Sequence, residues 1–311
     1  MRTIFIDNLK KNQTLTNYIS MVFPNLAYSM LKKALRNKDI KVNLKRVTCD
    51  VILANNDRLD IYITDDILFN LPTLLDYIYE DDNILAIYKP QGLLSNNEEK
   101  LSNLQIKKIG GLEPTLEDLV CSIYSLAKIC HRLDRNTAGI VLFSKHDSAY
   151  TELLRGFKNA NIEKKYLAYV FNASFTKKSE VLNNYILKDP KAGFSKIFNT
   201  KVPQSQSICT KYNVIFTNFV KNYAILEVNI YTGKTHQIRA QLEAISHPII
   251  GDPKYCTNEI NRKFKIYKQL LFAIKYTFNF ECNSILYYLN NIEIKLDNKY
   301  YEKKIGCDLN E

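Results

Sequence analysis

The sequence lacks any apolar run long enough to cross a membrane. Its apolar runs, such as Gly139–Phe143, fall far short of the roughly 20 residues that a membrane-spanning helix needs. The N-terminal residues Met1–Asp7 also lack the longer apolar segment and the small-residue cleavage site of a secretory signal. These absences predict a cytoplasmic protein with no membrane partner.

Cysteine pairs at metal-binding spacing are absent as well. The seven cysteines are scattered, and no two of them form a C-x-x-C pair, so the sequence indicates neither a zinc framework nor a thioredoxin-like motif. The odd count in a chain of 311 residues leads us to expect free thiols in a reducing compartment. They are Cys49, Cys121, Cys130, Cys209, Cys256, Cys282 and Cys307.

Internal repeats and low-complexity tracts are also missing. With 46% hydrophobic and 24% charged residues, the chain has the composition of a folded protein. Strand-like segments rich in Ile, Val, Tyr and Phe are mixed with a few helical ones without regular alternation, which predicts an α+β fold. The length allows one large domain and one small one.

Positive charge is abundant and unevenly distributed. The formal net charge is +11, and residues 1–60 carry eleven Lys and Arg against five Asp and Glu. A basic small domain ahead of a less basic large one suggests a polyanionic partner, most simply RNA or DNA. Charge that only keeps a Lys-rich protein in solution is the alternative interpretation.

Residues 14–63 have the pattern of a small α/β module. Apolar residues at helical spacing predict a first helix that stops at Pro24 and a second helix over 27–36. Strands are expected at 40–43 and 58–63. We therefore expect a first domain at 1–64.

This module resembles the S4 RNA-binding domain, although the glycines usual in that family are missing near Lys38 and Asn56. The resemblance implies that a basic helix and the loop after it contact folded RNA. An ordinary α/β module with a solvated basic face is the alternative. The implied RNA-binding residues are Lys32, Lys33, Arg36 and Lys38.

The segment 65–75, with two aspartates and a proline, is predicted to be a linker. A larger mixed-sheet domain is expected at 76–305. Within it, 93–111 has the composition of a polar loop and 116–128 has helical spacing.

The most informative segment of the chain is 131–145, where the single carboxylate of Asp134 lies among cations. Arg132 and Arg135 flank it, and His131 can add a third charge. Nearby positive charge keeps a carboxylate ionised, and an oriented carboxylate can act as a nucleophile or general base. The apolar run that follows predicts a buried strand. A surface ion-pair loop ahead of a core strand is the alternative.

Five segments then occur in order, at 79–92, 131–145, 164–170, 231–239 and 247–255. In this order and spacing they resemble the RluA family of RNA pseudouridine synthases. With the S4-like module, they are most similar to its two-domain members that act on large-subunit rRNA. The resemblance implies an enzyme that isomerises uridine to pseudouridine in RNA without a cofactor or metal. It favours rRNA over tRNA as the partner, and we expect a monomer.

The resemblance also assigns roles to single residues. Asp134 matches the catalytic aspartate, which acts at the ribose as a nucleophile or base. Tyr166 matches the active-site tyrosine, which can stack on a flipped uracil or transfer a proton. Lys234 matches a basic residue, more often Arg, that pairs with the aspartate. The expected substrate-binding residues are Arg132, Arg135, Arg239 and His131.

Other interpretations of these motifs remain open. Gly233-Lys234-Thr235 is not a phosphate-binding loop, because the earlier glycine of that motif would fall on Val228. His236 and Gln237 are expected to shape a strand rather than to act in catalysis. The alternative functions are a tRNA pseudouridine synthase, a non-catalytic S4-type RNA-binding protein and a glycosidic-bond hydrolase. The hydrolase would need a second carboxylate near Asp134.

Overall fold

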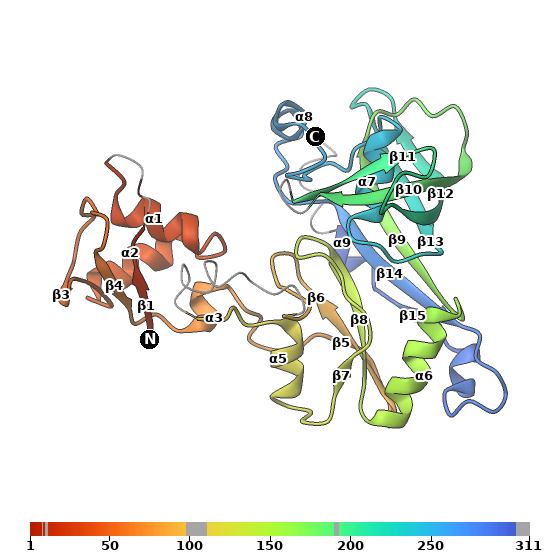
Figure 1. Ribbon diagram of the computed structural model, residues 1–311, viewed down its shortest axis with the longest axis horizontal. Coiled ribbons are helices and arrows are strands. Elements are labelled where there is room, and N and C mark those ends of the chain that lie inside the picture. Colours follow the sequence, from red (N-terminus) through yellow and green to blue (C-terminus); the bar gives the residue numbers. More distant parts are fainter. Residues whose placement is uncertain (8, 10–11, 98–110, 190–192, 303–311) are drawn as a thin grey trace. The chain divides into compact units, whose positions relative to one another are not determined.

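The computed structural model describes residues 1–7, 9, 12–97, 111–189 and 193–302, and the chain divides into two compact units (Figure 1). The second unit begins at Asp76. One later segment, Gly92–Ile123, also belongs to the first unit. The first unit consists of Met1–Leu75 and Gly92–Ile123, and the second of Asp76–Gln91 and Tyr124–Glu311.

The first unit contains a four-stranded antiparallel sheet in the order β1-β4-β2-β3, with two helices whose apolar sides join the same core. The first helix begins where the Thr14 side chain accepts a hydrogen bond from the backbone of Asn17, and it ends just before Pro24. The elements are β1 (Arg2–Phe5), α1 (Leu15–Val22), α2 (Tyr28–Arg36), β2 (Ile40–Val42), β3 (Lys45–Arg46) and β4 (Arg58–Ile61).

Two turns of this unit take the backbone conformation that glycine usually supplies. Lys38 has a φ of 63° and Asn56 a φ of 68°, both in the left-handed region. These are the places where the glycines of S4 domains are missing from the sequence. The turns therefore form without glycine, and Asn is one of the residues that tolerate this region best.

Part of the predicted linker is folded, so that prediction is wrong for its first half. Residues Asp65–Leu68 form the short helix α3, and Leu68 and Phe69 are buried in the core of the first unit. Arg2 binds both carboxylate oxygens of Asp65, at 2.7 and 2.9 Å. The buried apolar residues and this ion pair therefore hold the segment against the first unit. Its two aspartates alone had predicted that it is exposed.

Two sequence predictions concern the region between the first and second of the five segments. Most of the polar loop expected at 93–111 lies outside the described residues. The helix expected over 116–128 is shorter: α5 covers Leu116–Cys121, with a capping box between Thr115 and Asp118 at its start. The chain then turns into the short strand β7 (Lys128–Ile129).

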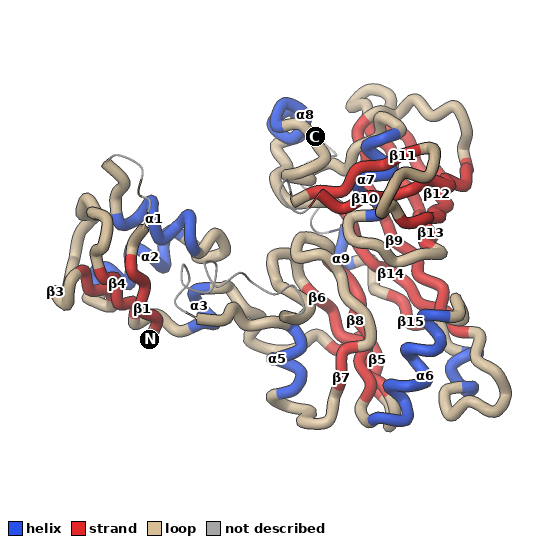
Figure 2. The backbone as a smooth tube through the Cα atoms, viewed as in Figure 1, coloured by secondary structure: helices blue, strands red, loops and turns tan. Residues whose placement is uncertain are grey.

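The second unit is built on an eleven-stranded mixed sheet (Figure 2), which confirms the predicted α+β class. The main path is β11-β10-β12-β13-β9-β14-β8-β6-β5, with β15 beside β14 and β7 beside β8. Its strands, besides β7, are β5 (Tyr77–Glu80), β6 (Ile84–Lys89), β8 (Ala138–Ser144), β9 (Ile162–Phe171), β10 (Ser179–Asp189), β11 (Phe194–Phe198), β12 (Gln206–Asn218), β13 (Tyr223–Ile230), β14 (Leu271–Phe278) and β15 (Ile294–Lys295). Its helices are α6 (Asp147–Lys158), α7 (Gln237–Ala244), α8 (Asn258–Phe264), α9 (Lys299–Glu302) and the 3₁₀ helix η1 (Tyr287–Asn291).

The strand that follows Asp134, β8, lies inside this sheet between β14 and β6. Every residue of β8 is buried, as its apolar run predicts, and β8 pairs in parallel with β14. Gly139 has a φ of 127°, and a Cβ atom there would lie 2.3 Å from the carbonyl oxygen of Ala273. Only glycine lets the two strands approach this closely, so the end of β8 beside Asp134 is tightly set.

The described residues contain no helix that is both long and apolar enough to span a bilayer. The six cysteines in this part of the chain are unpaired, as expected, and Cys307 lies outside it.

Candidate active site

A cavity of about 430 Å³ opens in the second unit between β9, the turn before β8 and the loop before α7. It brings together side chains from three of the segments that the sequence singled out. The charged and polar residues among those that line it are His131, Arg132, Asp134, Thr137, Lys158, Lys164, Tyr166, Lys234, Thr235, His236, Gln237 and Arg239.

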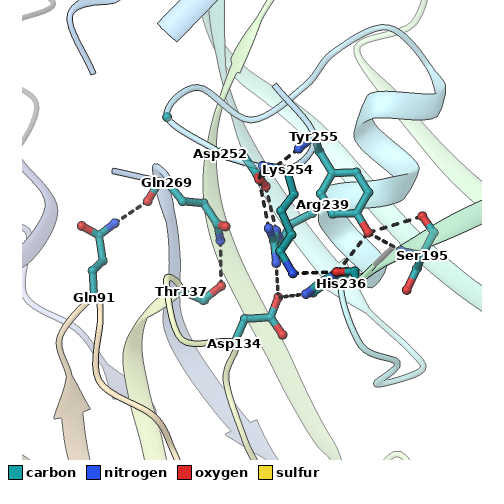
Figure 3. A network of polar contacts seen from close by, with 12 residues as sticks. Gln91, Asp134, Thr137, Ser195, His236, Arg239, Asp252, Lys254, Tyr255 and Gln269 are labelled. Atoms are coloured by element: carbon teal, nitrogen blue, oxygen red, sulfur yellow. Dashed lines mark hydrogen bonds and ion pairs between the residues drawn. The ribbon is translucent and has the colours of Figure 1, made fainter. Parts of the chain in front are cut away.

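Asp134 lies in a turn that the surrounding structure fixes from several sides (Figure 3). The backbone N–H of Thr137 donates to the carbonyl oxygen of Asp134 at 3.0 Å, which closes the turn. The Thr137 hydroxyl accepts from the Gln269 amide at 2.8 Å. The buried ammonium of Lys89 donates to the carbonyl oxygen of Arg135 at 3.0 Å. The backbone around the carboxylate is therefore held before any ligand arrives.

Arg239 is the cation that contacts Asp134. Its Nη1 donates to Asp134 Oδ2 at 2.9 Å, while its Nε and Nη2 donate to the two oxygens of Asp252 at 2.7 and 2.9 Å (Figure 3). Burial opposes the charge of Arg239, but the hydrogen bonds and charges of the two carboxylates raise its pKa above the usual value. A planar guanidinium can serve two carboxylates at once, which an ammonium cannot do with the same geometry.

The prediction that Lys234 pairs with Asp134 is therefore wrong for this structure. The ion pairs of Asp134 among the described residues are with Arg239 at 2.9 Å and with His236 at 3.9 Å. Lys234 lines the cavity, but it is exposed and lies three residues before the start of α7, whereas Arg239 lies inside the first turn of α7. The helix aims the arginine inward.

The segment around His236 and Gln237 also differs from the expected strand, because these residues begin α7. Gln237 is 3% exposed and makes four side-chain hydrogen bonds, two of which tie the loop together through Thr232 and the backbone of Lys234. Burial lowers the pKa of His236 to about 4, an effect that Asp134 only partly offsets. His236 is thus neutral near pH 7.

Asp252 is the residue that sequence reasoning missed. Its segment was singled out, but no role was given to it. The carboxylate is 0% exposed, and besides Arg239 it accepts hydrogen bonds from the backbone of Lys254 and Tyr255 at 2.8 and 3.1 Å. It precedes a proline and follows the left-handed Gly251 in the sequence, which indicated a tight turn but not the partner of the carboxylate.

Tyr166 lies on β9 and lines the same cavity as Asp134. Its side chain is 6% exposed and hydrogen-bonded to Tyr276, whose hydroxyl donates to the backbone of Ile140 at 3.3 Å. Burial, and then the negative charge of Asp134, raise the pKa of Tyr166 above its usual value. The phenol is therefore protonated at neutral pH.

The other predicted site residues differ in their surroundings. Arg132 is exposed at the edge of the cavity, and Arg135 is half-buried beside it without lining it. His131 is packed between the rings of Phe157 and Tyr276, and its Nε2 accepts from the backbone N–H of Leu142 at 3.0 Å. The expectation of a third cation at His131 is wrong, because burial and then the charge of Lys164 lower its pKa to about 3.

This neutral histidine predicts a loss of stability in mild acid. The unfolded chain takes up a proton near pH 6.5, whereas folded His131 does not do so until about pH 3. Its contribution to stability is complete above pH 6.5, and it falls by about 1.4 kcal/mol per pH unit below that value. Urea unfolding at pH 7 and pH 5 should show a smaller drop for His131→Gln, whose amide oxygen can still accept from Leu142. An equal drop for both proteins would contradict the assignment.

In the described part of the chain, no group of three or more His, Cys, Asp and Glu side chains is arranged to hold a metal ion. The cations that line the cavity outnumber its single carboxylate, and that carboxylate is already paired with Arg239. The cavity therefore favours an anionic ligand, even though the carboxylate of Asp134 is among the groups that line it.

Comparison with known proteins places these residues in a family. The family model described as RNA pseudouridylate synthase matches residues 83–244. A protein of Rickettsia prowazekii named ribosomal large subunit pseudouridine synthase C is 30% identical over 266 residues, which cover 79% of this chain and 83% of that protein. An uncharacterized RNA pseudouridine synthase of Mycoplasma capricolum is 29% identical, with 94% of this chain and 96% of that protein covered.

A solved structure shares the fold. Human RNA pseudouridylate synthase domain containing 1 superimposes with a TM-score of 0.58 at 18% identity, over 75% of this chain and 87% of that one. The family match spans Asp134, Tyr166 and Arg239 and covers more than half of the chain. The family expected from the five segments is thus confirmed, and this chain belongs to the RNA pseudouridylate synthases.

Proposed function

We propose that this enzyme converts specific uridines of large-subunit ribosomal RNA to pseudouridine, with Asp134 as the residue that attacks or deprotonates the target nucleotide. The observation that carries the proposal is a lone carboxylate, held by Arg239 and faced by Tyr166, in a cavity otherwise rich in cations. Relatives named ribosomal large subunit pseudouridine synthases support the choice of RNA.

The reaction needs no net change in composition. The bond between C1′ and N1 of uridine breaks, the uracil turns within the cavity, and C5 bonds to C1′ in its place. The proton on C5 then leaves, and N1 gains one. A fixed carboxylate beside the ribose supplies the group that assists the first step, and Arg239 keeps it oriented. The ring of Tyr166 supports the uracil, and its hydroxyl supplies a proton donor.

The target base must leave the RNA stack to reach this cavity. Extruding a base costs a few kcal/mol, which phosphate contacts and stacking can offset. Arg132 is suited to a phosphate contact because it is exposed at the edge of the cavity.

We propose that the first unit is an S4-like domain that anchors folded RNA. Lys32, Lys33 and Arg36 lie on α2 and Lys38 follows it, and all four side chains are exposed. Exposed cations on one short helix can contact the phosphates of an RNA while that RNA stays folded.

The hydrolase alternative is less well supported. A second carboxylate does lie near Asp134, but Asp252 is buried and its oxygens are occupied by Arg239 and backbone N–H groups. It cannot act as the second acid or base that glycosidic hydrolysis usually requires.

Tritium release from RNA labelled at uridine C5 tests the proposal, since C5 must lose its hydrogen when it becomes the glycosidic carbon. Wild-type protein is expected to release tritium from large-subunit rRNA fragments and not from tRNA transcripts. Release from tRNA alone would favour the tRNA enzyme, and free uracil among the products would favour a hydrolase. Tight binding with no release, repeated on partly assembled ribosomal particles, would favour a non-catalytic RNA-binding protein.

A further inference from the structure

We propose that Lys164 binds the phosphodiester that joins the target uridine to its neighbour, at the exit from the catalytic cavity. The inference rests on the proposed function and adds a contact that the five segments alone do not assign.

Lys164 lies on a wall shared by two cavities. A second cavity of about 280 Å³ adjoins the catalytic one, and both are lined by Lys164, Phe157 and Ile230. The Lys164 Nζ lies 5.2 Å from the centre of the Phe157 ring, and it would be 3.6 Å from a Cβ atom at Gly233. The ammonium is therefore held between a ring and a loop at the junction of the two spaces.

The distance along the strand suits a nucleotide. Lys164 and Tyr166 are two residues apart on β9 and line the same cavity, so they share a face of the strand. Residues at this spacing are about 6.6 to 6.8 Å apart. A uridine whose uracil rests on Tyr166 would therefore place its own phosphate toward Lys164, and the neighbouring nucleotide would enter the second cavity beside the exposed ring of Tyr231.

The charges around Lys164 favour an anion from outside the protein. The carboxylate that lines the second cavity, Glu163, accepts hydrogen bonds from Asn229 and Thr277. Asp134 is paired with Arg239. The structure gives Lys164 a ring contact with Phe157 and no ion pair among the described residues. Burial lowers the pKa of Lys164, and an RNA phosphate would restore the stability of its charged form.

The adjacent Lys165 provides a matched control. It lies on the same strand, it is paired with Glu227 at 3.1 Å, and it is not among the residues that line either cavity. Lys164→Gln and Lys165→Gln therefore remove the same charge one residue apart. Circular dichroism and urea midpoints establish that both variants are folded.

The test measures tritium release on the RNA that the wild-type enzyme modifies. Lys164→Gln should raise KM about tenfold. It should also reduce the slope of log affinity against log salt by about 0.7, the value for one phosphate contact on single-stranded RNA. Lys165→Gln should change neither quantity. Equal effects of the two variants would overturn the proposal.

A neutral methylphosphonate linkage identifies the phosphate. Placed on one side of the target uridine, it should weaken wild-type affinity about tenfold, and the same linkage should cost Lys164→Gln nothing further. The contact would be rejected if the methylphosphonate, placed on the 5′ side or on the 3′ side, weakened the affinity of Lys164→Gln as much as it weakened that of the wild-type protein. Wild-type inactivity on every RNA would instead reject the proposed function, so the two failures are distinguishable.

Discussion

Replacing Asp134 with asparagine should reduce uridine isomerisation by about 10⁴-fold or more, because an amide is neither a nucleophile nor a base. The change preserves shape, and an amide oxygen can still accept the 2.9 Å hydrogen bond from Arg239 Nη1. RNA binding should therefore survive. Tritium release under single-turnover conditions, with RNA affinity measured in parallel, separates the chemical step from binding.

Asp134 is 22% exposed at its side chain, so the loss of its charge leaves Arg239 with Asp252 as a partner and should not unfold the protein. Urea midpoints of the two proteins verify this point. Wild-type rates in a folded Asp134→Asn variant would exclude the catalytic role.

Replacing Asp252 with asparagine should have the second largest effect, on stability as well as on rate. The carboxylate and the guanidinium of Arg239 are 0% and 4% exposed, and the removal of one partner from a buried pair typically costs about 3 to 5 kcal/mol. Arg239 would keep its contact with Asp134, but it would lose the carboxylate that fixes the other edge of its guanidinium group. A shift of about 1 Å in a catalytic group can lower kcat about 100-fold.

The kinetic pattern distinguishes positioning from general loss of structure. Asp252 lies behind Arg239 and does not line the cavity, so kcat should fall while KM stays near the wild-type value. Asp252→Glu, which keeps the charge, should recover part of kcat. Asp147→Asn is the matched control, because that aspartate is 83% exposed in a pair with Lys128 and its loss should change neither rate nor midpoint. If KM rises and kcat is unchanged, the positioning role is refuted.

The elements with strong local signals could be predicted from the sequence. Helix α1, which ends before Pro24, helix α2 and the apolar run of β8 depend on short-range periodicity and on residues that end an element. Local signals failed at α3 and α7. In α3, the burial of Leu68 and Phe69 outweighs two aspartates, and in α7 the residues expected on a strand begin a helix. Tertiary contacts decided both cases.

The sequence by itself named Asp134 and Tyr166 as candidate catalytic residues, and both line one cavity in the structure. Only the tertiary structure decided how Asp134 is held and which groups are charged. Arg239 reaches Asp134 across 105 residues of sequence, and Asp252 fixes it from within the core. His131 is neutral because it is packed between two rings. Ion pairing and protonation depend on distance and burial, which arise only when separate strands and loops of the sheet come together.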